Sequence, residues 1–317
     1  MHPGFSVIFL TTLIGAGQGL FLALYAAELA QALNIVQTSP DRMFFVGGSL
    51  ISLVFTGLGA IASLFHLGHP ERAWRALAMW RTSWLSREGI ALPSFMLAVF
   101  IYALAHYFGW AGTRVIGAVA VVLCITLFIC TGMIYACIKF LQEWASPLTV
   151  VNYAVLGCAS GFTLATAFSA VAADSLVAAY GMAAIGFTAL GLVTRSASLV
   201  RNSRLKPKST LQSATGIHHP RIIQKSMGFM GGSYNTREFF HGRRKSFLRS
   251  IKWTFLALAF AAPLLLLLLG VGMGVSVASA SVLILAFLVQ YIGLIAERWF
   301  FFAQSNHPQN LYYQAIS

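Results

Sequence analysis

Long apolar segments alternate with short polar ones along almost the whole chain. A helix needs about 20 apolar residues to cross a bilayer, and eight segments meet that length. They are Val7–Leu33, Met43–Phe65, Glu88–Phe108, Val115–Phe140, Leu148–Ala172, Leu176–Val193, Ile251–Val271 and Val275–Ala296. No segment alternates as a barrel strand does, and lipid cannot satisfy a free backbone. The pattern predicts an all-α integral membrane protein, a single polytopic domain over residues 1–317. Its eight transmembrane helices form a bundle with both termini on the same face.

Composition agrees with this pattern. The mean hydropathy is +0.77 and 58% of the 317 residues are hydrophobic, more than a soluble core of this size can use. The first apolar segment has no basic n-region and no small-residue cleavage site. We therefore expect a retained helix and not a signal peptide.

Charge is distributed very unevenly between the two predicted faces. Of the 21 Lys and Arg residues, 19 fall on the face that carries the termini, and only Arg42 and Arg114 fall on the other. Cytoplasmic loops of membrane proteins carry an excess of Lys and Arg. The charge count therefore predicts that the termini face the cytoplasm.

Most of this charge lies in the sixth connection, residues 195–250, where Glu238 is the one acidic residue. A basic segment can be held at anionic lipid headgroups. This one also mixes glycines, methionine and aromatics, as in an interface core with a charged rim. We favour a partner-docking connection over lipid contact alone, and nucleic-acid binding is not expected beside a membrane. Its candidate docking residues are Arg221, Asn235, Arg237, Glu238 and Arg243.

The second connection, residues 66–88, concentrates histidine, arginine, glutamate and tryptophan. Trp74, Trp80 and Trp84 suit the headgroup region, so the segment should lie along the membrane surface. Glu88 is expected in the first turn of the third helix, with Ser86 as the N-cap. A carboxylate there can simply stabilise the helix end.

A second interpretation makes this loop a quinone site. A quinol releases two protons with its two electrons, so its site needs proton acceptors. His66 and Glu88 flank the loop and could converge as the catalytic pair. Arg87 or Arg81 could hold the carboxylate or a quinone carbonyl, within an apolar surround. The candidate quinone-binding residues are His66, Gly68, Arg81, Ser83, Trp84, Arg87 and Glu88.

Metal ligands are not expected in this chain. Its four cysteines show no Cys-x-x-Cys spacing, so neither a metal ion nor an iron–sulfur cluster is predicted. No span offers paired histidines, and His106 alone does not favour haem b. Glu28 is an intramembrane carboxylate and hence a functional candidate.

Three long motifs resemble the dimethyl sulfoxide reductase anchor subunit family. They are "HLGHPERAWRAL…RTSWLSRE", "TGIHHPRIIQKSMGFMGGSYNTREFFHG" and "AERWFFFAQSNHPQNLYYQ". The resemblance implies a multi-pass anchor in the bacterial cytoplasmic (inner) membrane, which binds ubiquinone or menaquinone. It also implies a four-cluster iron–sulfur subunit and a molybdopterin catalytic subunit as partners. His66, Gly68 and Glu88 match the family's quinone-site motif.

The predicted orientation separates two branches of this family. Dimethyl sulfoxide reductases carry their catalytic subunits on the outer face and oxidise quinol. A related branch, which anchors cytoplasmic sulfite dehydrogenases that reduce quinone, agrees better with the charge count. A secondary transporter would show Gly- or Pro-interrupted helices in corresponding halves, and none are found. A purely structural anchor would explain the docking connection but not the pairing of His66 with Glu88.

Overall fold

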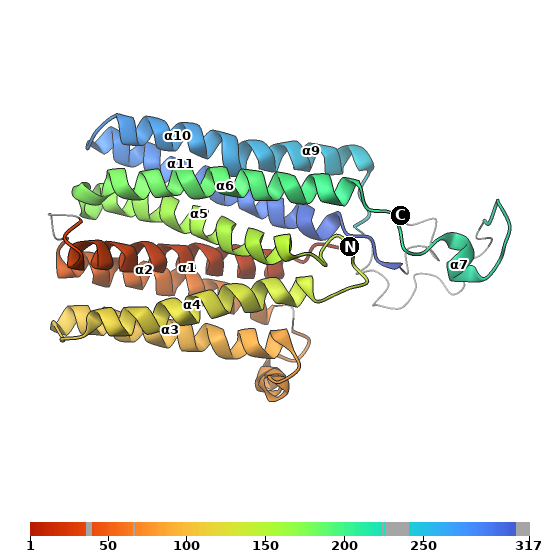
Figure 1. Ribbon diagram of the computed structural model, residues 1–317, viewed down its shortest axis with the longest axis horizontal. Helices are drawn as coiled ribbons and strands as arrows, with labels where there is room; N and C mark the ends of the chain where they lie inside the picture. Colours follow the sequence, from red (N-terminus) through yellow and green to blue (C-terminus); the bar gives the residue numbers. More distant parts are fainter. Residues whose placement is uncertain (36–39, 66, 224, 226–240, 309–317) are drawn as a thin grey trace.

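Among the residues that the structure describes, eight helices are long and apolar enough to cross a membrane, and they make up the bulk of the protein (Figure 1). The computed structural model describes residues 1–35, 40–65, 67–223, 225 and 241–308. Seven spans are the single helices α1 Phe5–Ala32, α2 Arg42–Leu64, α3 Trp84–Phe108, α4 Thr113–Ala136, α5 Pro147–Ala172, α6 Val177–Ser203 and α11 Val277–Ala303. The remaining span joins α9 Lys245–Leu256, the π-helical turn η3 Ala257–Ala261 and α10 Ala262–Gly272. The predicted all-α membrane fold is confirmed.

The first residue of the chain meets the end of α11 at one end of the bundle. The Met1 amine donates a hydrogen bond of 2.9 Å to the carbonyl oxygen of Ser305, just after α11. The starts of α3 and α5 and the end of α6 lie at this same end (Figure 1). We call it the terminal end. The start of α1 and the end of α11 lie at the same end because the number of spans is even, and each pair of helices returns the chain to the end from which it started.

Helix α1 runs through the middle of the bundle and crosses α5 at very short range. Gly15 and Gly19 of α1 face Gly157 and Gly161 of α5. A Cβ atom built on Gly161 would lie 2.2 Å from the Cα of Gly19, so no larger side chain fits. Small residues spaced four apart allow such close backbone packing in membranes, where no hydrophobic force draws helices together.

Four helices extend by several residues further at the terminal end than the apolar segments predict, among them α9, which begins at Lys245 and not at Ile251. Helix α3 begins at Trp84, α6 continues to Ser203, and α11 continues to Ala303. These extra turns carry the buried charged residues Arg195 and Glu297. A prediction from apolar length ends each span at the first charged residue. In the folded bundle a charged residue can lie inside a span when it is paired with an opposite charge. The sixth connection therefore begins after Ser203.

The sixth connection projects from the terminal end of the bundle (Figure 1). Among its described residues it forms one short helix, α7 Leu211–Thr215. Thr210 and Ser213 close a capping box at its start.

Candidate functional site

The segment before α3 forms the 3-10 helix η1 Pro70–Met79, which packs against α3 near the terminal end. None of its residues is buried, and its Trp74 side chain is 69% exposed. The Ser86 hydroxyl donates a short hydrogen bond to the carbonyl of Ala76. Leu77 packs closely over Gly89. These contacts hold η1 against the first turns of α3.

The N-cap of α3 is Ser83. Its hydroxyl oxygen accepts from the backbone N–H of Ser86 at 3.4 Å, and the backbone N–H of Arg87 donates to the Ser83 carbonyl at 3.2 Å. The expectation that Ser86 caps the helix was wrong, because the turn ending at Thr82 starts the helix earlier. Glu88 lies beyond the free N–H groups of the first turn. The simple role of first-turn stabiliser therefore does not fit its position.

The Glu88 side chain is buried and faces the interior of the bundle. Its Oε1 accepts a hydrogen bond of 2.5 Å from the Thr131 hydroxyl of α4. It lines an enclosed cavity of about 10 Å³ between α1, α3, α4 and α5, together with Gln18 and Tyr153. We call this the Glu88 cavity. It has room for about one water molecule.

Arg87 points the other way. Its guanidinium carbon lies 4.2 Å from the ring centroid of Trp84. Its Nε donates to the carbonyl of Trp80 at 2.9 Å, and its Nη2 donates to the carbonyl of Arg81 at 2.8 Å. The suggestion that Arg87 or Arg81 holds the Glu88 carboxylate is not met, because Thr131 does so and neighbouring residues of a helix point about 100° apart.

A groove on the outer surface of α3 and α4 begins at Arg87. We call it the α3–α4 groove, and its volume is about 330 Å³. Its walls are largely apolar, and two of its lining residues, Ile90 and Ile129, are 41% and 42% exposed on the outside of the bundle. The lining residues are Trp80, Trp84, Arg87, Ile90, Ala91, Ser94, Leu123, Thr126, Ile129 and Cys130.

The groove and the Glu88 cavity lie back to back. Arg87 and Cys130 line the groove, and their chain neighbours Glu88 and Thr131 line the cavity behind. A thin wall thus separates an apolar, outward-facing groove from a buried carboxylate.

The other predicted quinone-site residues are placed differently. Gly68 is exposed and has open space around it. Arg81 is exposed, with its guanidinium 5.4 Å from the Trp80 ring. His66 lies outside the described residues, so its pairing with Glu88 stays a prediction.

Two predicted docking residues are described. Arg221 and Arg243 are exposed, and their backbone N–H groups each donate to a histidine Nδ1 at 3.0 Å, in His219 and His241 respectively. Partial burial, followed by the nearby N-terminal ammonium, lowers the pKa of His241. Asn235, Arg237 and Glu238 lie outside the described residues, so the docking role stays a prediction.

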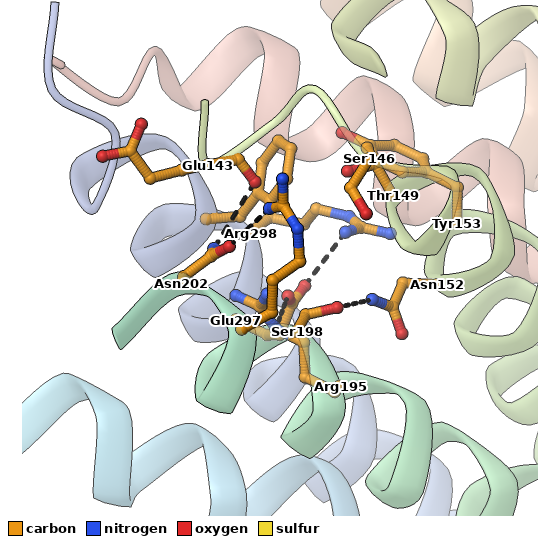
Figure 2. A pocket seen from close by; sticks show the side chains of 12 residues that line it. Glu143, Ser146, Thr149, Asn152, Tyr153, Arg195, Ser198, Asn202, Glu297 and Arg298 are labelled. Atoms are coloured by element: carbon orange, nitrogen blue, oxygen red, sulfur yellow. Dashed lines mark hydrogen bonds and ion pairs between the residues drawn. The ribbon is translucent and has the colours of Figure 1, made fainter. Parts of the chain in front are cut away.

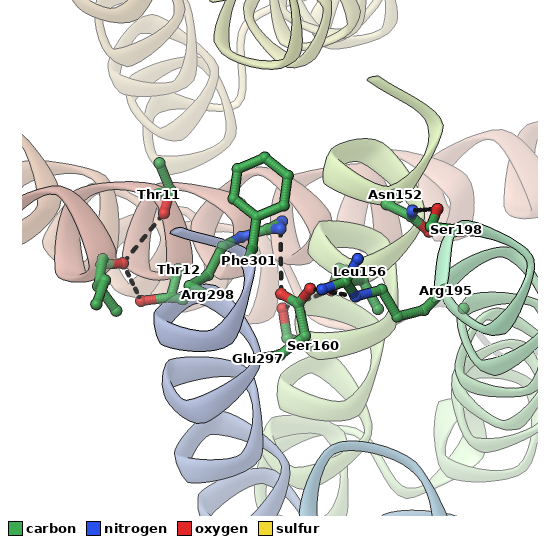
Figure 3. Close-up of polar contacts among 12 residues, drawn as sticks. Thr11, Thr12, Asn152, Leu156, Ser160, Arg195, Ser198, Glu297, Arg298 and Phe301 are labelled. Carbon is green, nitrogen blue, oxygen red and sulfur yellow. Dashed lines mark hydrogen bonds and ion pairs between the residues drawn. The ribbon is translucent and has the colours of Figure 1, made fainter. Parts of the chain in front are cut away.

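A buried ion cluster at the terminal end was not predicted (Figure 3). Glu297 of α11 lies between two arginines and is fully buried. Its Oε1 is 2.6 Å from Arg195 Nε of α6, and its Oε2 is 3.1 Å from Arg298 Nη1. The guanidinium carbon of Arg298 also lies 3.7 Å from the Tyr153 ring centroid. The sequence did contain a signal for this cluster. A carboxylate within an apolar segment indicates a functional or paired residue, and this rule applies to Glu297 as it does to Glu28.

A second enclosed cavity adjoins this cluster (Figure 2). Its volume is about 10 Å³, and we call it the Glu297 cavity. Asn152 and Ser198 close one side of it, with the Asn152 amide donating to the Ser198 hydroxyl at 2.7 Å. Tyr153 lines this cavity as well as the Glu88 cavity.

A third buried carboxylate, that of Glu28, lies near the end of α1, away from the terminal end. Its Oε2 accepts from the Tyr102 hydroxyl at 2.8 Å, and its Oε1 accepts a short hydrogen bond from Thr113. The His106 ring stacks on Phe45, with centroids 4.5 Å apart. Its Nε2 is 3.7 Å from Glu28 Oε1. No group of three or more metal-ligating side chains occurs within the described part of the chain.

Comparison with known proteins agrees with this architecture. The family model described as DMSO reductase anchor subunit (DmsC) matches residues 1–304. The chain belongs to this family. One curated relative is a sulfite dehydrogenase subunit from Allochromatium vinosum. It is 49% identical over 330 aligned residues, which cover 100% of both chains.

Membership of the DMSO reductase anchor subunit family shows what kind of subunit carries the groove and the cavities described above. The protein is a multi-pass membrane anchor subunit, and it partners catalytic oxidoreductase subunits. The groove, the two cavities and the sixth connection are all features of the terminal half of this anchor.

Proposed function

We propose that this anchor subunit binds a quinone headgroup in the α3–α4 groove and exchanges electrons between quinone and an iron–sulfur subunit. A molybdopterin subunit is the catalytic partner beyond it. The observation that carries the proposal is the groove itself, an apolar recess open to the outside of the bundle with one arginine and a hidden carboxylate at its edge.

The groove suits a quinone in size and chemistry. Its volume of about 330 Å³ falls in the usual range for small-molecule pockets. Trp80 and Trp84 offer flat apolar faces to a ring. Arg87 uses Nε and Nη2 on carbonyls of the chain, and Nη1 makes no hydrogen bond to any described residue. That nitrogen is free to donate to a quinone carbonyl.

Glu88 supplies the proton chemistry. Reduction of a quinone to a quinol consumes two electrons and two protons, so a proton donor must stand beside the groove. Glu88 is separated from the groove by the wall of Ala91 and Cys130, and Thr131 fixes its carboxylate. It can exchange protons with the interior while the groove remains apolar.

Electrons enter or leave through a partner. The sixth connection projects from the terminal end, and Arg87 lies near the start of α3 at that same end. A four-cluster iron–sulfur subunit docked on this basic connection would bring its nearest cluster to the terminal end. Arg221 and Arg243 would belong to that contact surface.

Two further observations support the proposed direction of electron flow and the proposed orientation. The relative from Allochromatium vinosum is a sulfite dehydrogenase subunit, which favours electron flow from sulfite to quinone. The 19 Lys and Arg on the terminal side favour a cytoplasmic docking face in a bacterial inner membrane. The second candidate, suggested by the family description, is a dimethyl sulfoxide reductase-type anchor that oxidises quinol at the outer face.

Membrane vesicles of defined sidedness test function and orientation together. Sulfite is an anion and does not cross a sealed bilayer quickly. Inside-out vesicles that contain the whole complex should therefore reduce their quinone when sulfite is added outside. Right-side-out vesicles should do so only after they are permeabilised.

Quinone reduction by added sulfite in intact right-side-out vesicles, but not in inside-out vesicles, would reverse the orientation. Quinol oxidation by added dimethyl sulfoxide in right-side-out vesicles, with no response to sulfite in either preparation, would favour the second candidate. A complex without this anchor subunit, assayed with a soluble electron acceptor, controls for activity of the partners alone.

A further inference from the structure

Buried polar groups of α5, α6 and α11 at the terminal end lack partners that their burial demands. Asn152 Oδ1 and Arg195 Nη2 are buried and make no hydrogen bond among the described residues. The Tyr153 hydroxyl is also buried, next to the hydroxyl of Tyr135. The two Glu297 oxygens contact arginine nitrogens but in poor hydrogen-bond geometry. Such groups are normally satisfied by ordered water.

The two enclosed cavities are placed to hold that water. Each has a volume of about 10 Å³, enough for about one molecule. Tyr153 forms part of the wall of both, so its side chain separates the water site near Glu88 from the one near Glu297. A hydroxyl can accept a proton on one lone pair and release its own on the other side.

The Glu297 cavity continues toward the solvent at the terminal end. Glu143 lies at its rim, half-buried, and its Oε1 accepts from Asn306, which is exposed, at 3.4 Å. Asn202, also at the rim, donates to the carbonyl oxygen of Glu143 at 3.4 Å. Polar groups thus extend from the surface into the cavity (Figure 2).

The positive charge of the cluster restricts what can pass. Arg195 and Arg298 face the single carboxylate of Glu297, leaving a net charge of +1 in a low-dielectric setting. A metal cation would be repelled there. A proton carries the same unit charge and is repelled as well, so it must cross the cluster without resting there, and the Glu297 carboxylate offsets part of the repulsion.

We infer that protons reach Glu88 from the terminal face through the Glu297 cavity, the Tyr153 hydroxyl and the Glu88 cavity. This rests on the proposed quinone chemistry. Two electrons from the iron–sulfur partner and two protons delivered by this route convert one quinone into one quinol, with an O–H bond formed at each oxygen. Glu88, Tyr153 and the water molecules recover their original protonation after each transfer. Proton uptake and partner docking thus share one face.

Tyr153→Phe tests the route because it removes the hydroxyl and keeps the ring that stacks on Tyr135. In the intact complex, quinone-linked turnover should fall on the order of tenfold, and its solvent isotope effect should rise. Activity with an artificial electron carrier should not change. Tyr180→Phe is the matched control, because its buried hydroxyl donates to the Ala23 carbonyl outside both cavities.

A second variant guards against misfolding of the first. Asn152→Leu keeps the branched shape of the side chain and removes the polar amide from the lining of the Glu297 cavity, so it should slow the same step. High-resolution maps of the complex provide a readout other than activity. Water density should appear beside Tyr153 Oη in both cavities and should be absent in Tyr153→Phe.

The outcomes distinguish this inference from the proposed function. If Glu88→Gln stops quinone-linked turnover while Tyr153→Phe and Asn152→Leu run at the wild-type rate, the route is wrong and the quinone site stands. Dry cavities on both sides of Tyr153 would also overturn the route. If Glu88→Gln itself turns over normally, the proposed role of Glu88 fails first.

Discussion

Glu88→Gln should leave an assembled complex that no longer turns over with quinone. Loss of a proton-transferring group typically costs 10²–10⁴-fold in rate, and we expect a drop of about that size. Glutamine keeps the shape of the side chain and can still accept from the Thr131 hydroxyl. Assembly, and activity with an artificial carrier that bypasses the membrane, should therefore be retained. The assay is quinone-linked turnover of the purified complex.

The chain supplies a matched control in Glu28→Gln. Glu28 is likewise buried and hydrogen-bonded, but it lies at the opposite end of the bundle from the groove. The Glu28→Gln variant should therefore keep quinone-linked turnover at the wild-type rate. Wild-type turnover of Glu88→Gln across the pH range would exclude Glu88 as the proton donor, and equal losses in both variants would point to general damage.

Glu297→Leu should strongly destabilise the protein. It leaves Arg195 and Arg298 buried at the terminal end without their carboxylate. Breaking a buried ion pair by removing one partner costs about 3–5 kcal/mol. We expect little accumulation in membranes and a clearly lower unfolding midpoint in detergent, measured by size-exclusion chromatography after heating.

Two further variants sharpen this test. Arg195→Leu combined with Glu297→Leu returns the buried net charge to +1 and should recover part of the lost stability. Glu71→Ala removes an exposed carboxylate that pairs with His69 and should change the free energy of unfolding by about 0.5 kcal/mol at most. A wild-type midpoint for Glu297→Leu would show that the cluster contributes nothing to the fold.

The helical bundle could be predicted from sequence because apolar length is a sufficient signal for a membrane span. Span ends could not, because charged residues that pair inside the bundle look like loop residues in a single sequence. Arg195 was assigned to a connection for this reason, and Glu297 was overlooked. The pairing of Arg195 with Glu297 joins α6 to α11 across more than 100 residues of sequence. No local sequence pattern predicts such a pair.

The candidate site was predicted in part. The interfacial loop, Trp84, Arg87 and Glu88 were identified from their chemistry, but not the fact that Arg87 and Glu88 face opposite sides of α3. The angle of about 100° between neighbouring helical residues is fixed, but which of the two side chains faces the interior depends on how α3 packs against its neighbours, as in the contact of Glu88 with Thr131 of α4. The close crossing of α1 and α5 had a visible signal in its paired glycines, Gly15 with Gly19 and Gly157 with Gly161.

The central claim is that quinone occupies the α3–α4 groove. Photolabelling of the intact complex with an azido-quinone, followed by peptide mapping, tests it most directly. The account predicts label on residues 80–94 and 123–130, competed away by excess quinone. Competable label confined to other helices, such as the α1 and α2 segments around Glu28, would contradict it.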